Sequence, residues 1–110
     1  MMDWVKLVKA QAPDLELLYA IPNGGHRNKI VAAKLKKEGV KAGMPDLHLP
    51  VARQGFNSLY IEMKAQGGRV SPAQSEKIEA LTQAGNAVYV CVGADAAIRT
   101  LSDYVGLSYD

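Results

Sequence analysis

Apolar residues recur at two spacings along this chain, and the alternation of the two spacings predicts a mixed α/β fold. Apolar positions three or four residues apart favour helices at 3–11, 28–38 and 95–105, with a further helix between Ser71 and Gly85. Runs rich in Val, Ile, Leu and Tyr favour strands at 15–21, 46–51, 58–64 and 86–92. The predicted order is α-β-α-β-β-α-β-α.

Turn and capping residues mark where these elements end. A polar loop with Gly55 and Asn57 suggests a hairpin between the second and third strands. Ser71 fits the N-cap of the third helix, Pro72 its first turn, and Gln74 the position that closes a capping box. These signals predict a β-hairpin followed by a well-capped helix.

The length and composition indicate a single domain, 1–110. A chain of 110 residues that is 48% apolar can bury a working core, and no apolar run approaches the ~20 residues of a membrane span. One cysteine excludes an internal disulfide framework and fits a reducing cytoplasm. Because Cys91 lies in an apolar strand with no visible base, we expect it to be a core residue.

Basic residues are clustered although the net charge is only +2 at pH 7. Six of the thirteen Lys and Arg residues lie close together: Arg27, Lys29, Lys34, Lys36, Lys37 and Lys41. The lysine face of the second helix is either ordinary solvated surface or a surface that follows a phosphate backbone. The preceding turn is either a plain connector or a nucleic-acid contact, because Gly24 and Gly25 permit close backbone approach and Arg27 can grip a phosphate.

Two carboxylates and a lysine are placed for metal-dependent chemistry. Asp46 begins one predicted strand, and Glu62 and Lys64 lie two residues apart on the next, where they share a face. Two carboxylates from neighbouring strands suit Mg²⁺ or Mn²⁺, and the backbone carbonyl of Met63 could add a third oxygen. The metal would activate water and neutralise phosphate charge, while Lys64 orients that water or stabilises the developing charge. The alternative is that all three are surface charges.

Two further residues have open alternatives. Gln74 either acts beside this cluster or only closes the capping box, and both roles are compatible because its helix would begin near the Glu62 strand. His48 follows Asp46 by two residues and is expected to be a polar neighbour rather than a ligand or base. Core or dimer contacts are the simplest interpretation of four aromatic residues: Trp4, Tyr19, Tyr60 and Tyr89. No stacking platform for single strands is evident.

The pattern Pro45-Asp46 followed by Glu62-Met63-Lys64 resembles the signature of the PD-(D/E)XK nuclease superfamily. The flanking segments are similar to the VRR-type nuclease domain, VRR-NUC, in its stand-alone phage and bacterial form. These segments are Asn23-Gly24-Gly25 followed by Arg27, a helix rich in Ala and Lys, Gly39-Val40, Gly43-Met44-Pro45-Asp46, and Ser71 with Gln74.

The resemblance implies a restriction-endonuclease-like α/β core with a central mixed sheet flanked by helices. It implies a metal at Asp46 and Glu62, with Lys64 and Gln74 as catalytic neighbours. Nucleic-acid contacts are expected from five residues: Asn23, Gly24, Arg27, Lys36 and Ser71. The implied activity is that of a Mg²⁺- or Mn²⁺-dependent endodeoxyribonuclease. It would act as a homodimer on branched DNA such as Holliday junctions or flaps, in the cytoplasm (the host's if phage-encoded), with no membrane partner.

One departure from the family pattern concerns the first helix, which usually carries a Glu. Here it offers only Asp3, and the next acidic candidate, Glu16, follows Pro13 in a predicted strand. This departure leaves open whether one or two metals bind. Two other functions also stay open: a non-catalytic DNA-binding module with a nuclease-like fold, and an RNA-directed endonuclease of the same superfamily.

Overall fold

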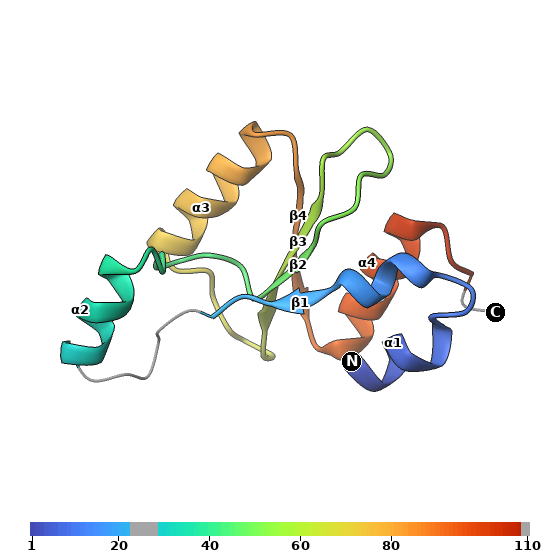
Figure 1. The fold of residues 1–110 in the computed structure, drawn as a ribbon, viewed down its shortest axis with the longest axis horizontal. Coiled ribbons are helices and arrows are strands. Elements are labelled where there is room, and N and C mark those ends of the chain that lie inside the picture. The colour runs from blue at the N-terminus through green and yellow to red at the C-terminus, as the bar shows by residue number, and fades with distance from the viewer. Residues whose placement is uncertain (23–28, 109–110) are drawn as a thin grey trace.

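The computed structural model describes residues 1–22 and 29–108, so Asn23, Gly24 and Arg27 lie outside the described residues. The elements follow one another in a simple order (Figure 1). They are α1 (Met2–Val8), the 3₁₀ helix η1 (Pro13–Leu17), β1 (Tyr19–Ala20), α2 (Lys29–Lys37), β2 (Leu47–Leu49), β3 (Leu59–Lys64), α3 (Pro72–Gln83), β4 (Ala87–Val92) and α4 (Ala94–Val105). None of the described helices is long and apolar enough to cross a membrane.

The four strands form one mixed sheet in the order β1-β2-β3-β4. β1 pairs with β2, and β2 with β3, in antiparallel fashion, whereas β3 and β4 run parallel. A parallel pair needs a long crossover, and α3 supplies it between β3 and β4. The predicted mixed sheet and the predicted hairpin of the second and third strands are therefore confirmed.

The main core lies on the face of the sheet that α1 and α4 cover, while α3 lies on the other side (Figure 1). Its buried apolar side chains come from helices and strands alike: Val5, Leu15, Leu47, Leu49, Leu59, Ile61, Cys91, Ala97, Leu101 and Tyr104. Cys91 is 3% exposed, as expected of a core residue. Because side chains alternate along a strand, Glu62 and Lys64 point to the opposite face, toward α3.

The start of α3 is capped as predicted. The side-chain oxygen of Ser71 accepts a hydrogen bond from the backbone N–H of Gln74 at 3.2 Å. In return, the side-chain oxygen of Gln74 accepts from the backbone N–H of Ser71 at 2.8 Å. Such a cap contributes roughly 1 kcal/mol to stability and fixes where the helix begins.

The predicted strand at 15–21 is wrong over most of its length. Residues Pro13–Leu17 form the 3₁₀ helix η1, and only Tyr19–Ala20 pair as a strand. Leu15 and Leu18 are both buried, and their three-residue spacing fits a tight helical turn better than strand alternation. Backbone bonds from Leu15 to Ala12 and from Leu18 to Leu15 close that turn. Glu16 therefore stands on a 3₁₀ helix, not on a strand.

Candidate active site

Asp46 lies just before β2, where the antiparallel register brings it beside β3. Leu47 pairs with Ile61, so the position before Leu47 lies opposite the position after Ile61, which is Glu62. The carboxylate of Asp46 accepts a hydrogen bond from the backbone N–H of Met63 at 2.7 Å. This bond fixes the Asp46 side chain against β3 and next to Glu62.

Glu62 is the buried centre of the cluster, with 2% of its surface exposed. Its Oε2 accepts a hydrogen bond from the Gln74 amide at 3.2 Å and lies 3.5 Å from the Lys64 ammonium. Among the described residues, Oε1 of Glu62 has no hydrogen-bond partner although it is buried. A buried carboxylate oxygen is costly to leave unpaired, so this atom calls for a proton, water or cation.

Burial raises the pKa of the Glu62 carboxyl to about 7. Asp46 raises this pKa further, because a protonated Glu62 can donate a hydrogen bond to Asp46 and an ionised one is repelled by it. Lys64 acts in the opposite direction but does not cancel these effects. A cation bound between the two carboxylates would remove the repulsion and favour the ionised form.

Gln74 connects the helix cap to this cluster. Its side-chain oxygen, which already accepts from Ser71, also accepts from the Lys64 ammonium at 2.8 Å. Its side-chain nitrogen donates to Glu62. The capping role and the place beside the cluster therefore coexist in one side chain, and the amide holds the orientations of both Lys64 and Glu62.

Gly43 lets the segment before Asp46 pass against the first turn of α3. Its φ is +81°, and a Cβ atom there would lie 2.5 Å from the carbonyl oxygen of Ala73. Only glycine permits both the left-handed backbone and this approach. The Gly43-Met44-Pro45-Asp46 segment is thus locked between α3 and β3, which explains its local sequence.

The family model of the VRR-NUC domain matches residues 2–95. This chain belongs to the VRR-NUC domain family. A solved structure described as a "VRR_NUC domain protein" is similar to it, with 32% sequence identity and a TM-score of 0.78. The match covers 97% of this chain and 85% of that one. No curated protein matches the chain. The VRR-NUC family is nuclease-like, and the mixed sheet flanked by helices is consistent with a restriction-endonuclease-like fold.

The VRR-NUC domain brings together four of the side chains singled out in the sequence: Asp46, Glu62, Lys64 and Gln74. Ser71 is exposed at the start of α3 beside them. Lys36 is exposed on α2, which lies beyond α3 from the α1 side of the molecule (Figure 1). The three predicted contacts in the 23–28 turn have no described structure.

Two carboxylates are the acidic content of this VRR-NUC site. No group of three or more His, Cys, Asp or Glu side chains able to hold a metal occurs in the described part of the chain. Glu16 does not fill the place of the first-helix acid, because its exposed side chain pairs with Lys9 at 3.6 Å. Asp3 is exposed on α1, which covers the other face of the sheet (Figure 1).

His48 lies on the same face of the sheet as the carboxylates, but both ring nitrogens have protein partners. Nδ1 lies 2.7 Å from the Tyr19 hydroxyl and Nε2 lies 3.0 Å from the Ser58 hydroxyl. Burial lowers the pKa of the His48 imidazole. This arrangement agrees with a polar neighbour rather than a metal ligand. Sequence spacing did not indicate that Tyr19, expected in a core or dimer contact, stands 47% exposed beside it.

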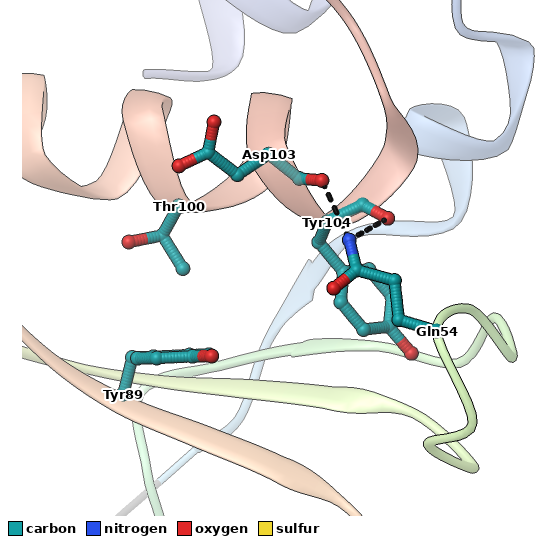
Figure 2. Close-up of a pocket in the computed structure, with 5 residues that line it drawn as sticks. All are labelled: Gln54, Tyr89, Thr100, Asp103 and Tyr104. Atoms are coloured by element: carbon teal, nitrogen blue, oxygen red, sulfur yellow. Dashed lines mark hydrogen bonds between the residues drawn. The ribbon is translucent and has the colours of Figure 1, made fainter.

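A small pocket of ≈ 100 Å³ lies elsewhere, on the α4 side of the sheet (Figure 2). Five residues line it: Gln54, Tyr89, Thr100, Asp103 and Tyr104. The Gln54 amide donates to the backbone carbonyls of Asp103 and Tyr104, at 2.7 and 3.3 Å, and so ties the hairpin loop to α4. Since no member of the carboxylate cluster lines this pocket, we assign it a packing role.

Proposed function

We propose that this VRR-NUC domain is a Mg²⁺- or Mn²⁺-dependent endonuclease that hydrolyses phosphodiester bonds in DNA. One observation carries the proposal. A carboxylate oxygen of Glu62 is buried without a partner beside the carboxylate of Asp46. Two adjacent carboxylates, one lacking any compensating donor, fit a hard divalent cation better than they fit a packed core.

The donor set for such a cation would be Asp46, Glu62 and the backbone carbonyl of Met63. Within an extended residue the N–H and C=O point to the same side, and the N–H of Met63 points to Asp46. Its carbonyl therefore faces the same side. A bound divalent cation would supply Lewis-acid chemistry, by lowering the pKa of a bound water and offsetting phosphate charge.

Lys64 and Gln74 would serve the reacting phosphate. The Lys64 ammonium is held 3.5 Å from Glu62 and 2.8 Å from the Gln74 oxygen, so it is positioned before substrate arrives. A held cation of this kind stabilises negative charge as it develops on the phosphate, or orients the attacking water. Gln74 would keep Lys64 and Glu62 in place, as its two hydrogen bonds already do.

Basic surface near the site supports a nucleic-acid substrate. Lys34, Lys36 and Lys37 are exposed on α2, and α2 contains no acidic residue in its first turn. A lysine surface of this kind contacts phosphates without reading bases. Together with family membership, it favours DNA as the partner, with Lys36 and Ser71 as candidate phosphate contacts.

We further propose a homodimer that acts on branched DNA such as Holliday junctions or flaps. One site makes one nick, so symmetric cleavage of two strands needs two sites related by a two-fold axis. Within the described residues β4 pairs only with β3, and its free edge carries no charged side chain. Such an edge invites a partner strand. Antiparallel pairing of two β4 strands would continue the sheet and open both sites on the same face.

The testing experiment is a cleavage panel with Mn²⁺ or EDTA on a four-way junction, a flap, linear duplex and RNA. We expect metal-dependent cutting of the branched DNA, its loss with Glu62→Gln, and full activity of the control Glu76→Gln, whose side chain is exposed on α3. Cleavage in EDTA would refute the proposal. DNA binding with no cleavage would indicate the non-catalytic module instead, and cleavage of RNA alone the RNA-directed enzyme.

A further inference from the structure

Three aromatic rings form a row across β1, β2 and β3. Tyr19 pairs with His48 in the strand register, and His48 pairs with Tyr60. The His48 ring stacks on Tyr60 with centroids 4.1 Å apart and 12° between the planes, and Tyr19 meets His48 edge-on at 5.3 Å. Tyr19 is half-exposed and the other two are half-buried, so this aromatic row offers ring surface to solvent.

A chain of hydrogen bonds fixes the row in place. The Asn86 amide nitrogen donates to the carbonyl of Leu81 at 3.0 Å, so its oxygen accepts from the Ser58 hydroxyl at 2.6 Å. The Ser58 oxygen must then accept from Nε2 of His48, which leaves Nδ1 to accept from the Tyr19 hydroxyl. The chain thus runs from the edge strand β1 to the end of α3, with one proton direction throughout.

The aromatic row adjoins the candidate active site on the same face of the sheet. Asp46 precedes His48 by two residues and Glu62 follows Tyr60 by two, so each carboxylate stands about 7 Å along its strand from a ring. A strand of nucleic acid with its reacting phosphate at the carboxylates would carry a neighbouring nucleotide over the rings. The row itself contains no acidic side chain that would repel it.

We infer that the aromatic row binds an unpaired base of the nucleotide next to the cut phosphate, by stacking. This inference takes the position of that phosphate from the proposed function. Stacking on aromatic rings tolerates any base, because every base has a π-face. In linear duplex both faces of each base are covered by neighbouring base pairs, whereas a branch point frees a base. The row therefore selects branched or unpaired DNA over duplex, which the carboxylates alone do not.

The testing experiment measures binding in EDTA, so that it is independent of cleavage. The probe is a flap or four-way junction that carries 2-aminopurine at the branch, compared with linear duplex. Tyr19→Leu removes the exposed ring and keeps an apolar side chain, and the control Tyr19→Phe keeps the ring but loses the hydroxyl. We expect Tyr19→Leu to weaken branched-DNA binding about five- to a hundredfold, with Tyr19→Phe much closer to wild type.

Duplex affinity should be unchanged in both variants, and the 2-aminopurine quenching seen with wild type should be lost only in Tyr19→Leu. A second variant, Tyr60→Leu, should give the same selective loss, provided that its thermal unfolding stays cooperative. Equal binding of branched DNA by wild type and Tyr19→Leu would overturn the inference, as would equal losses on branched and duplex DNA. A protein that quenches 2-aminopurine but never cuts would sink the proposed nuclease activity and leave the stacking site standing.

Discussion

The side-chain amide of Gln74 donates a hydrogen bond to the buried carboxylate of Glu62, across 3.2 Å between the first turn of α3 and β3. The same side chain closes the capping box of the helix. Helix initiation and orientation of the cluster thus depend on one residue. Removing the amide and removing the cap are nevertheless separable, since Ser71 takes part only in the cap.

Gln74→Ala should lose both stability and activity. The cap contributes roughly 1 kcal/mol, and Lys64 and Glu62 also lose a shared hydrogen-bond partner. Ser71→Ala is the matched control, because it removes the hydroxyl of the cap and leaves the amide of Gln74. We expect similar losses in urea unfolding for the two variants but a much larger loss of kcat for Gln74→Ala. Equal loss of kcat in both would mean that Gln74 acts through the helix alone.

The stability of the metal-free protein should fall as pH rises through about 7. The folded-state pKa of Glu62 is raised from 4.5 to about 7, so its contribution is complete below pH 4.5 and is lost above the folded pKa. The loss should reach up to about 3 kcal/mol between pH 4.5 and 8. Urea unfolding in EDTA would measure it. Glu62→Gln should flatten the profile and Glu76→Gln should leave it intact, while added Mn²⁺ should restore stability at pH 8.

Lys64→Ala should abolish cleavage while sparing metal binding, whereas Glu62→Ala should weaken both. The reason is that Lys64 offers a cation to the phosphate and only the carboxylates offer oxygens to a metal. Calorimetric titration with Mn²⁺ and single-turnover cleavage separate the two effects. If Lys64→Ala bound no metal, or retained full cleavage, the division of roles between these residues would be wrong.

Gly43→Ala should destabilise the protein more than Gly67→Ala. Both glycines have positive φ, +81° and +79°, so both substitutions strain the backbone. Only at Gly43 does the new Cβ meet backbone atoms, those of Ala73 at 2.5 Å; at Gly67 there is nothing within 4 Å. We expect Gly43→Ala to cost about 1–3 kcal/mol beyond the control in thermal or urea unfolding, with reduced activity as Asp46 shifts.

Val90→Lys should dissociate the proposed homodimer. Val90 is 44% exposed on the free strand β4, and a charge on a strand edge opposes pairing with a second strand. Light scattering should then show a monomer, with the cutting of linear DNA less affected than the paired cutting of a junction. Leu17→Lys, at a 53% exposed position of η1, is the control and should stay dimeric. A monomeric wild-type protein would contradict the assembly.

The cluster was predictable from sequence because its spacing is set by strand geometry. Glu62 and Lys64 share a face by alternation, and the capping signals at Ser71 and Gln74 place the start of α3 near them. The strand expected at 15–21 failed because Leu15 and Leu18, read as strand residues, are buried at a helical interval. The unpaired oxygen of Glu62 and the aromatic row depend on register across three strands, which local patterns in one sequence do not define.

Glu62 gives the protein a way to meet DNA with less repulsion. With its pKa near 7, about half of the molecules hold a proton on this carboxyl at neutral pH when no metal is present. The resting site then presents less negative charge to an approaching phosphate than two ionised carboxylates would. Arrival of a cation would displace that proton, so that the site becomes fully anionic only when the charge is already compensated. Proton release should therefore accompany loading, and acidic conditions should compete with the metal rather than merely slow the chemistry.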